Sequence, residues 1–269
     1  MIEVAWSDLD RSEFRDQRAA LTIGVFDGLH KGHLRLLQSI TRDQELLSVV
    51  VTFQRHPAEI LAAGSFPGFI MSLAQKREAL KQAGIGLVVL IDFSLEFSRL
   101  SGVEFLGRLV ETFNLEFAGI GHDFRCGRGV GMDGPAVMEY LSTHGVRVSL
   151  VDAYRDGKDI VSSTRIRECI TAGKLDTAQR LLGRPFALDL DGETIERDGS
   201  EAWISLDERG LLPQSSQILP PPGDYPVQIV ACDGSDSHGH LTIGRNSIRL
   251  ALAPKTRIRY IVLQENRVL

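Results

Sequence analysis

The stretch that decides the fold is Ala20–Gly24, which reads ALTIG, together with Gly24–His33, which reads GVFDGLHKGH. A short apolar run that ends in glycine predicts a buried strand, and the glycine-rich turn after it predicts the start of a helix. Ligands bind at the carboxyl ends of the strands in doubly wound sheets. Free backbone N–H groups and the positive end of the helix dipole favour anions at such a point.

Strand and helix patterns alternate over residues 20–152. Apolar residues recur at helical spacing over 34–47, whereas the β-branched run 48–53 predicts a strand. Alternation of this kind indicates an α/β fold, here a Rossmann-like parallel sheet covered by helices. Further strands are expected at 86–93, 115–121 and 146–152, and two short helices near 164–172 and 175–182.

Three of the expected helices begin with a recognisable cap. Ser72 with Gln75 matches a capping box, as does Ser101 with Glu104, and these helices would end near residues 83 and 113. Asp133 can cap a third helix, which has a proline in its first turn.

The pattern changes after Gly183-Arg184-Pro185. Short β-type runs follow, separated by Gly, Pro, Asp and Ser, and the proline-rich segment 218–226 cannot form a helix. We therefore expect two domains, 1–184 with the parallel sheet and 185–269 as a small all-β, barrel-like domain.

Composition excludes several functional classes. The 269 residues include 30 basic and 35 acidic side chains, and this net charge of −5 argues against a surface that coats nucleic acid. The longest apolar stretch, Leu87–Ile91, is far shorter than a membrane span, and no signal peptide is visible. The three scattered cysteines fit neither a disulfide framework nor a zinc motif. These features predict a cytoplasmic protein that binds neither nucleic acid nor membranes.

The glycine-rich stretch carries the first candidate site. His30 and His33 are spaced i, i+3, so both can face one ligand from the first helical turn, and Gly32 leaves room for that ligand. Two imidazoles and helix N–H groups can stabilise the charge that grows on a phosphorus atom under attack. The alternative is a glycine-rich turn with two exposed histidines.

The second candidate site is Val161–Arg167, VSSTRIR, at an expected helix start. Either serine can cap the helix, and an arginine in the first turns can form forked contacts with phosphate oxygens. The alternative is an ordinary helix cap with surface arginines. Lys76, on the helix that begins after Ser72, is expected to be a surface lysine, with a place beside a bound substrate as the alternative.

Five ordered segments resemble the HxGH nucleotidyltransferases, and more narrowly the bacterial bifunctional riboflavin kinase/FAD synthetases. The resemblance covers roughly residues 20–186 and consists of similar motifs in the same order. The segments are GVFDGLHKGH (24–33), TFQRHP (52–57), GHDFRCG (121–127), VSSTRIR (161–167) and LLGRPF (181–186).

The resemblance implies that ATP and FMN react to give FAD and pyrophosphate, with Mg²⁺ as the cofactor. It implies that His30 and His33 contact the ATP phosphates, and it assigns no metal ligand. It places Gly24, Phe26, Asp27 and Gly32 near the nucleotide, Ser163, Thr164 and Arg167 on the leaving pyrophosphate, and Phe53, His56 and Asp123 beside the flavin.

The sequence departs from the family pattern at several points. Arg55 replaces a proline, and Cys126 replaces an aromatic residue. No GxPTAN-type kinase segment occurs after residue 186, although 218–229 resembles a stretch of the family's kinase barrel. We therefore expect a degenerate barrel without riboflavin kinase activity.

Two alternatives remain open. One is another HxGH nucleotidyltransferase with a different phosphorylated acceptor, such as pantetheine phosphate, nicotinate mononucleotide or a polyol phosphate. The other is a flavin or nucleotide sensor without turnover. The sequence assigns no oligomeric state.

Overall fold

The computed structural model describes residues 1–9, 14–62, 64–251 and 256–264. The chain divides into two compact units, and neither is a continuous segment. Unit 1 comprises 1–26, 32–66 and 77–160, and unit 2 comprises 27–31, 67–76 and 161–269. The division into domains 1–184 and 185–269 stays a prediction.

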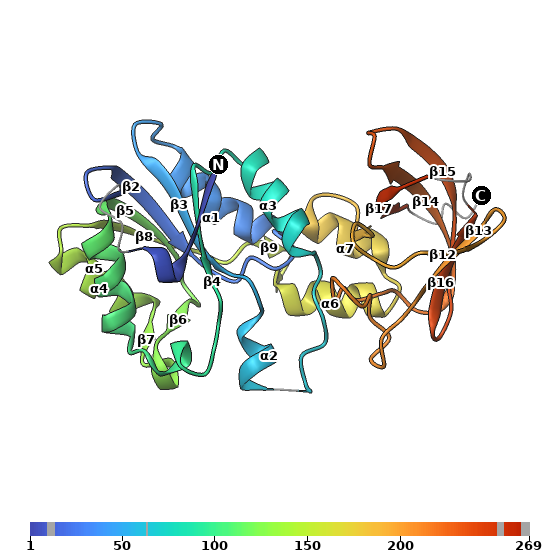
Figure 1. Cartoon of the computed structure of the whole chain (residues 1–269). Coiled ribbons are helices and arrows are strands. Elements are labelled where there is room, and N and C mark those ends of the chain that lie inside the picture. The colour runs from blue at the N-terminus through green and yellow to red at the C-terminus, as the bar shows by residue number, and fades with distance from the viewer. Residues whose placement is uncertain (10–13, 63, 252–255, 265–269) are drawn as a thin grey trace. The chain divides into compact units, whose positions relative to one another are not determined.

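A six-stranded parallel sheet forms the centre of unit 1 (Figure 1). The expected parallel sheet is thus confirmed. Its strand order is β1-β4-β3-β2-β5-β8, with the chain turning from one side of β2 to the other between β4 and β5. The strands are β1 (Ile2–Ala5), β2 (Arg18–Ile23), β3 (Leu47–Phe53), β4 (Leu87–Ile91), β5 (Asn114–Gly121) and β8 (Arg147–Val151).

Helices connect these strands. They are α1 (Lys31–Thr41), α2 (Pro57–Leu61), α3 (Leu73–Gln82), α4 (Gly102–Thr112) and α5 (Gly134–Thr143). Both capping boxes are confirmed: the Ser72 and Ser101 hydroxyls accept the N–H of Gln75 (3.0 Å) and Glu104 (3.2 Å), and the Gln75 and Glu104 side chains accept in return. Asp133 caps α5 as expected, accepting the N–H of Ala136 at 3.1 Å.

The core of unit 1 follows from the two-residue period of its strands. Alternate apolar residues such as Val49 and Val51 of β3 pack in one buried cluster with Leu106 and Leu109 of α4. Burying a side chain of this kind contributes roughly 1.5–3 kcal/mol to stability. Helix α1 packs closely on the sheet as well: a Cβ at Gly119 of β5 would lie 2.1 Å from the Ser39 hydroxyl.

Short elements complete unit 1. They are the 3₁₀ turns η1 (Trp6–Asp8), η3 (Phe97–Arg99) and η4 (Arg128–Val130), and the two-stranded pairs β6 (Arg125–Cys126) with β7 (Met132–Asp133) and β9 (Arg155–Asp156) with β10 (Asp159–Ile160).

Unit 2 holds two helices and a seven-stranded antiparallel sheet (Figure 1). The helices α6 (Ser163–Thr171) and α7 (Leu175–Leu182) lie where the sequence predicts them. The sheet, ordered β11-β17-β14-β15-β16-β13-β12, confirms the expected all-β region. Its strands are β11 (Ala187–Asp189), β12 (Glu196–Asp198), β13 (Glu201–Ser205), β14 (Gly223–Ala231), β15 (Asp236–Ile243), β16 (Ser247–Ala251) and β17 (Ile258–Leu263).

One expected helix ends earlier in the structure, and two strands of the structure were not expected. The helix expected over 34–47 ends at Thr41, and the Asp43 carboxylate then accepts the Glu45 N–H at 3.0 Å, a local turn that competes with helix. The sequence pattern does not predict β1, a parallel edge strand beside β4, or β12.

No described helix combines the length and the apolar character that crossing a bilayer requires.

Truncation of Leu106 tests the core of unit 1. Because Leu106 is buried among sheet and helix residues, Leu106→Ala should lower the free energy of unfolding by about 2–5 kcal/mol. The matched control is Val103→Ala on the same helix, where the side chain is exposed and the loss should stay within about 0.5 kcal/mol. Urea denaturation followed by circular dichroism measures both, and equal losses would contradict this core.

Candidate functional site

The carboxyl ends of β2, β3 and β5 meet at one edge of the unit 1 sheet, because these parallel strands are neighbours. The segments that leave these ends hold Gly24 and Phe26 after β2, His56 after β3 and Asp123 after β5. The strand order reverses beside β2, the place where open α/β sheets bind ligands. Three of the five segments, 24–33, 52–57 and 121–127, therefore lie at the carboxyl ends of these neighbouring strands.

Phe26 adopts a backbone conformation that is rare for its residue type. Its φ is 54°, in the left-handed region, and its ring is buried 5.2 Å from the imidazole of His33 in an edge-on contact. A Cβ at Gly24 would lie only 3.1 Å from that ring. Left-handed backbone costs about 1–3 kcal/mol and concentrates at functional sites. Phe26 and His33 therefore pack as one cluster, with Gly24 making room for it.

The three residues predicted beside the flavin have different surroundings. Phe53 packs edge-on against Phe93, with ring centroids 5.8 Å apart. His56 stacks on Phe66 at 4.7 Å, and its Nδ1 accepts the Ala58 N–H at 3.1 Å, which caps α2. Asp123 is exposed to solvent. Their role beside a flavin stays a prediction.

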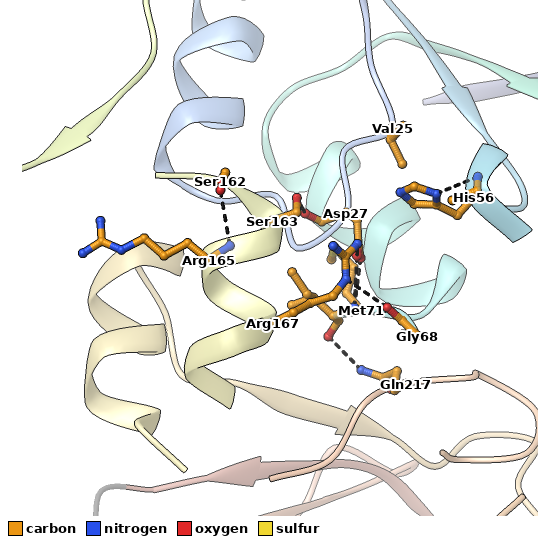
Figure 2. Close-up of polar contacts among 12 residues, drawn as sticks. Val25, Asp27, His56, Gly68, Met71, Ser162, Ser163, Arg165, Arg167 and Gln217 are labelled. Carbon is orange, nitrogen blue, oxygen red and sulfur yellow. Dashed lines mark hydrogen bonds and ion pairs between the residues drawn. The ribbon is translucent and has the colours of Figure 1, made fainter. Parts of the chain in front are cut away.

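In unit 2, Asp27 and Arg167 form a buried ion pair, with Arg167 Nη2 at 2.6 Å from Asp27 Oδ2 (Figure 2). The Asp27 side chain is 1% exposed and that of Arg167 11%. The Asp27 carboxylate also accepts the N–H groups of Ile70 (3.1 Å) and Met71 (3.3 Å), while Arg167 Nε donates to the Gly68 carbonyl at 3.0 Å. Arg167 is therefore no surface arginine, and its guanidinium orientation is fixed.

Burial dominates the electrostatics of this pair. It raises the pKa of the Asp27 carboxyl above its ordinary value, because desolvation disfavours the ionised form. The positive charges of Arg167 and Lys76 and the two N–H donors oppose this rise in pKa. Lys76 was expected on the surface, but that expectation is wrong: it is 3% exposed. Asp27 is thus influenced by two positive charges. The sequence pattern of the helix does not reveal that Lys76 is one of them.

The two serine hydroxyls of the SSTRIR segment make different contacts. Ser162 caps α6, accepting the Arg165 N–H at 3.3 Å, so the cap is the first of the two serines. Ser163 donates to the Asp27 carbonyl at 2.8 Å (Figure 2). Thr164 is exposed at the start of the helix. The segment therefore holds the backbone of the glycine-rich loop as well as supplying Arg167.

Arg184 also holds the glycine-rich loop, a role that the sequence analysis missed. Its Nη2 donates to the Gly28 carbonyl at 2.7 Å and its Nη1 to the Leu29 carbonyl at 3.1 Å. Gly28 has φ +79°, and a Cβ there would lie 3.1 Å from the Ile70 side chain. His30, which follows, is buried. The similarity of LLGRPF to the family pattern points to the segment that contains Arg184. The sequence around Arg184 does not show that its partners are the carbonyls of Gly28 and Leu29.

The part of the chain that the structure describes contains no group of three or more His, Cys, Asp or Glu side chains that could hold a metal ion. The three cysteines, Cys126, Cys169 and Cys232, are free thiols, as the sequence predicts.

Replacement of Asp27 tests the ion pair. Asp27→Asn keeps the shape but leaves the Arg167 charge without its buried partner, so the free energy of unfolding should fall by about 3–5 kcal/mol. The control is Asp92→Asn, which breaks the exposed Arg55–Asp92 pair (3.1 Å) and should cost at most about 1 kcal/mol. Chemical denaturation of both variants checks this, and a small loss in Asp27→Asn would argue against the pair.

Comparisons with known proteins agree with the architecture. The family model of FAD synthetase matches residues 12–165. The chain is 28% identical over 237 residues to the bifunctional riboflavin kinase/FMN adenylyltransferase of Escherichia coli strain K12, covering 87% of this chain and 75% of that protein. It is 31% identical over 212 residues to the Buchnera aphidicola protein described in the same words, covering 76% and 68%.

Two further matches extend this comparison. A protein of Listeria monocytogenes described as an FAD synthetase is 26% identical over 225 residues, covering 82% of this chain and 91% of its own length. A solved structure titled macrolide-efflux protein from Streptococcus pneumoniae superposes with a TM-score of 0.80 at 22% identity, over 98% of this chain and 89% of its own, a likeness that shows the fold alone. The family model matches more than half of the length of this chain, so the chain belongs to the FAD synthetase family.

Proposed function

We propose that this protein is an FMN adenylyltransferase, which transfers AMP from ATP to FMN and releases pyrophosphate. The observation that carries the proposal is the match of residues 12–165 to the FAD synthetase family, with GVFDGLHKGH at the carboxyl end of β2. The location is proposed to be the cytoplasm, and the substrates are small molecules.

The proposed reaction needs no protein nucleophile. A phosphate oxygen of FMN attacks the α-phosphorus of ATP in line, a new P–O bond forms, and the bond from the α-phosphorus to the bridging oxygen breaks. That oxygen leaves with pyrophosphate. His30 and His33 contact the phosphates and stabilise the charge that develops on them, with Gly32 and the start of α1 beside them.

Arg167 is proposed to bind the departing pyrophosphate, together with Ser163 and Thr164. Its ion pair with Asp27 and its bond to the Gly68 carbonyl orient the guanidinium before any substrate is present. A charge that is oriented in advance stabilises the transition state without reorganisation at the moment of reaction. Asp27 then acts as a positioning residue.

The acceptor side and the cation complete the proposal. Phe53, His56 and Asp123 would border the flavin, from the segments at the carboxyl ends of β3 and β5. Mg²⁺ commonly binds through one or two carboxylates together with substrate phosphates. We therefore propose that Mg²⁺ binds the ATP phosphates, and we assign none of the carboxylates of the chain to it.

Formation of FAD tests the proposal. With ATP, FMN and Mg²⁺, the purified protein should form FAD and pyrophosphate, and His30→Ala and Arg167→Ala should each lower kcat about 10²–10³-fold, since each removes a contact to developing charge. His144→Ala and Arg249→Ala, which change exposed side chains, serve as controls. Chromatography of the flavins measures the product, and full activity in both site variants would refute the assigned roles.

Riboflavin kinase activity is proposed to be lost from this chain, because no GxPTAN-type segment follows residue 186. The protein supplied with riboflavin and ATP should therefore form no FMN, while the same preparation converts FMN to FAD. Turnover of riboflavin would overturn this part and leave the adenylyltransferase proposal standing.

A further inference from the structure

Residues Gly68–Met71 form a strip of backbone that supplies the Asp27–Arg167 pair with three of its hydrogen-bonding groups. Gly68 offers its carbonyl to Arg167, and Ile70 and Met71 offer their N–H groups to Asp27. The orientation of the ion pair therefore depends on where this strip lies.

The other side of the strip is held by a segment far along the chain. Phe69 pairs with Gln217 in a parallel bridge, its N–H bonding to the Ser216 carbonyl and its carbonyl to the Ile218 N–H, each at 2.9 Å. Gly68, at φ +108°, allows this approach, since a Cβ there would lie 2.8 Å from the Ile218 side chain. Residues 216–218 thus fix the strip from the all-β region.

The Gln217 side chain is the centre of this junction. It is fully buried, at 0% exposure, and Figure 2 draws one of the hydrogen bonds of its carboxamide. Its Nε2 lies 3.1 Å from the Ile70 carbonyl and from two further acceptors, Gln75 Oε1 and the Ala187 carbonyl, and its Oε1 accepts the Asp189 N–H at 2.8 Å.

A second contact fastens the same region. The Ser72 hydroxyl donates to the carboxylate of Asp189, the same residue whose N–H binds Gln217. A buried polar network with every member paired is rigid, whereas loss of one member leaves buried groups unsatisfied. The network therefore transmits the position of β11 and of Gln217 to Ile70.

We propose that Gln217 is a positioning residue for adenylyl transfer: it holds Gly68–Met71 in the register that orients Asp27 and, through Asp27, the Arg167 guanidinium. The proposal rests on the proposed function of Arg167. The proposal gives the C-terminal region, which lacks the GxPTAN-type kinase segment, a part in the adenylyltransferase reaction. Gln217 lies outside the residues matched by the family model.

The test compares Gln217→Leu, which keeps the size but removes the carboxamide, with Gln228→Leu in β14. Gln228 also makes a side-chain hydrogen bond, to Asp236 at 2.7 Å, but that bond is exposed to solvent and does not involve the strip. At a temperature where circular dichroism shows both variants folded, Gln217→Leu should lower kcat/KM for ATP at least tenfold. Gln228→Leu should stay within twofold of the unchanged protein.

A double variant separates positioning from a general loss of structure. If Gln217 acts through Arg167, then Gln217→Leu combined with Arg167→Ala should be no worse than Arg167→Ala alone, within threefold. Multiplied losses, or full activity in folded Gln217→Leu, would overturn the proposal. If Gln217→Leu does not fold, Gln217→Asn, which only withdraws the carboxamide by one methylene, takes its place under the same criteria.

The proposed function can fail separately. If the unchanged protein forms no FAD, that proposal falls, and the role of Gln217 is then decided by calorimetric titration with ATP. Weaker ATP binding in Gln217→Leu and unchanged binding in Gln228→Leu would support positioning of Arg167. Equal affinities would overturn it.

Discussion

The buried ion pair between Asp27 and Arg167 is the interaction on which the proposed site depends. Removing two charges from water is costly, and their attraction offsets that cost only where the geometry is good and the remaining polar atoms are paired. Here the carboxylate accepts two backbone N–H groups and the guanidinium donates to a carbonyl. The pair therefore joins the glycine-rich loop, the strip at Gly68–Met71 and helix α6.

The glycine-rich loop shows a second constraint, on its carbonyl groups. The carbonyls of Val25, Asp27, Gly28 and Leu29 each accept a side-chain hydrogen bond, from Thr52, from Ser163 and from Arg184. A carbonyl oxygen repels an anion, whereas a backbone N–H attracts one. Protein donors thus engage the groups of this loop that would oppose phosphate binding, which suits a loop that binds a triphosphate.

The sequence predicts the local parts of this structure well. The capping boxes, the strands of the parallel sheet and helices α6 and α7 depend on residues a few positions apart, so their patterns are visible in the chain itself. The residues that pair with one another within the site cannot be predicted in this way. Arg167 is 140 residues from Asp27, and Gln217 is 147 from Ile70, so only the folded topology brings them together. The burial of Lys76 is likewise not visible in the sequence pattern of its helix.

Unit 2 is built from three separate segments of the chain, and this has a consequence for synthesis of the protein. Its members 27–31 and 67–76 leave the ribosome early, while the residues that hold them, such as Gln217, emerge more than a hundred residues later. The parallel sheet of unit 1 is complete once β8 has been translated, at residue 151. At that point Asp27 still lacks Arg167, which follows 16 residues after the end of β8, and Gly68–Met71 lack Gln217, which lies in the last third of the chain. Nascent chains therefore acquire a finished sheet before they acquire an oriented arginine.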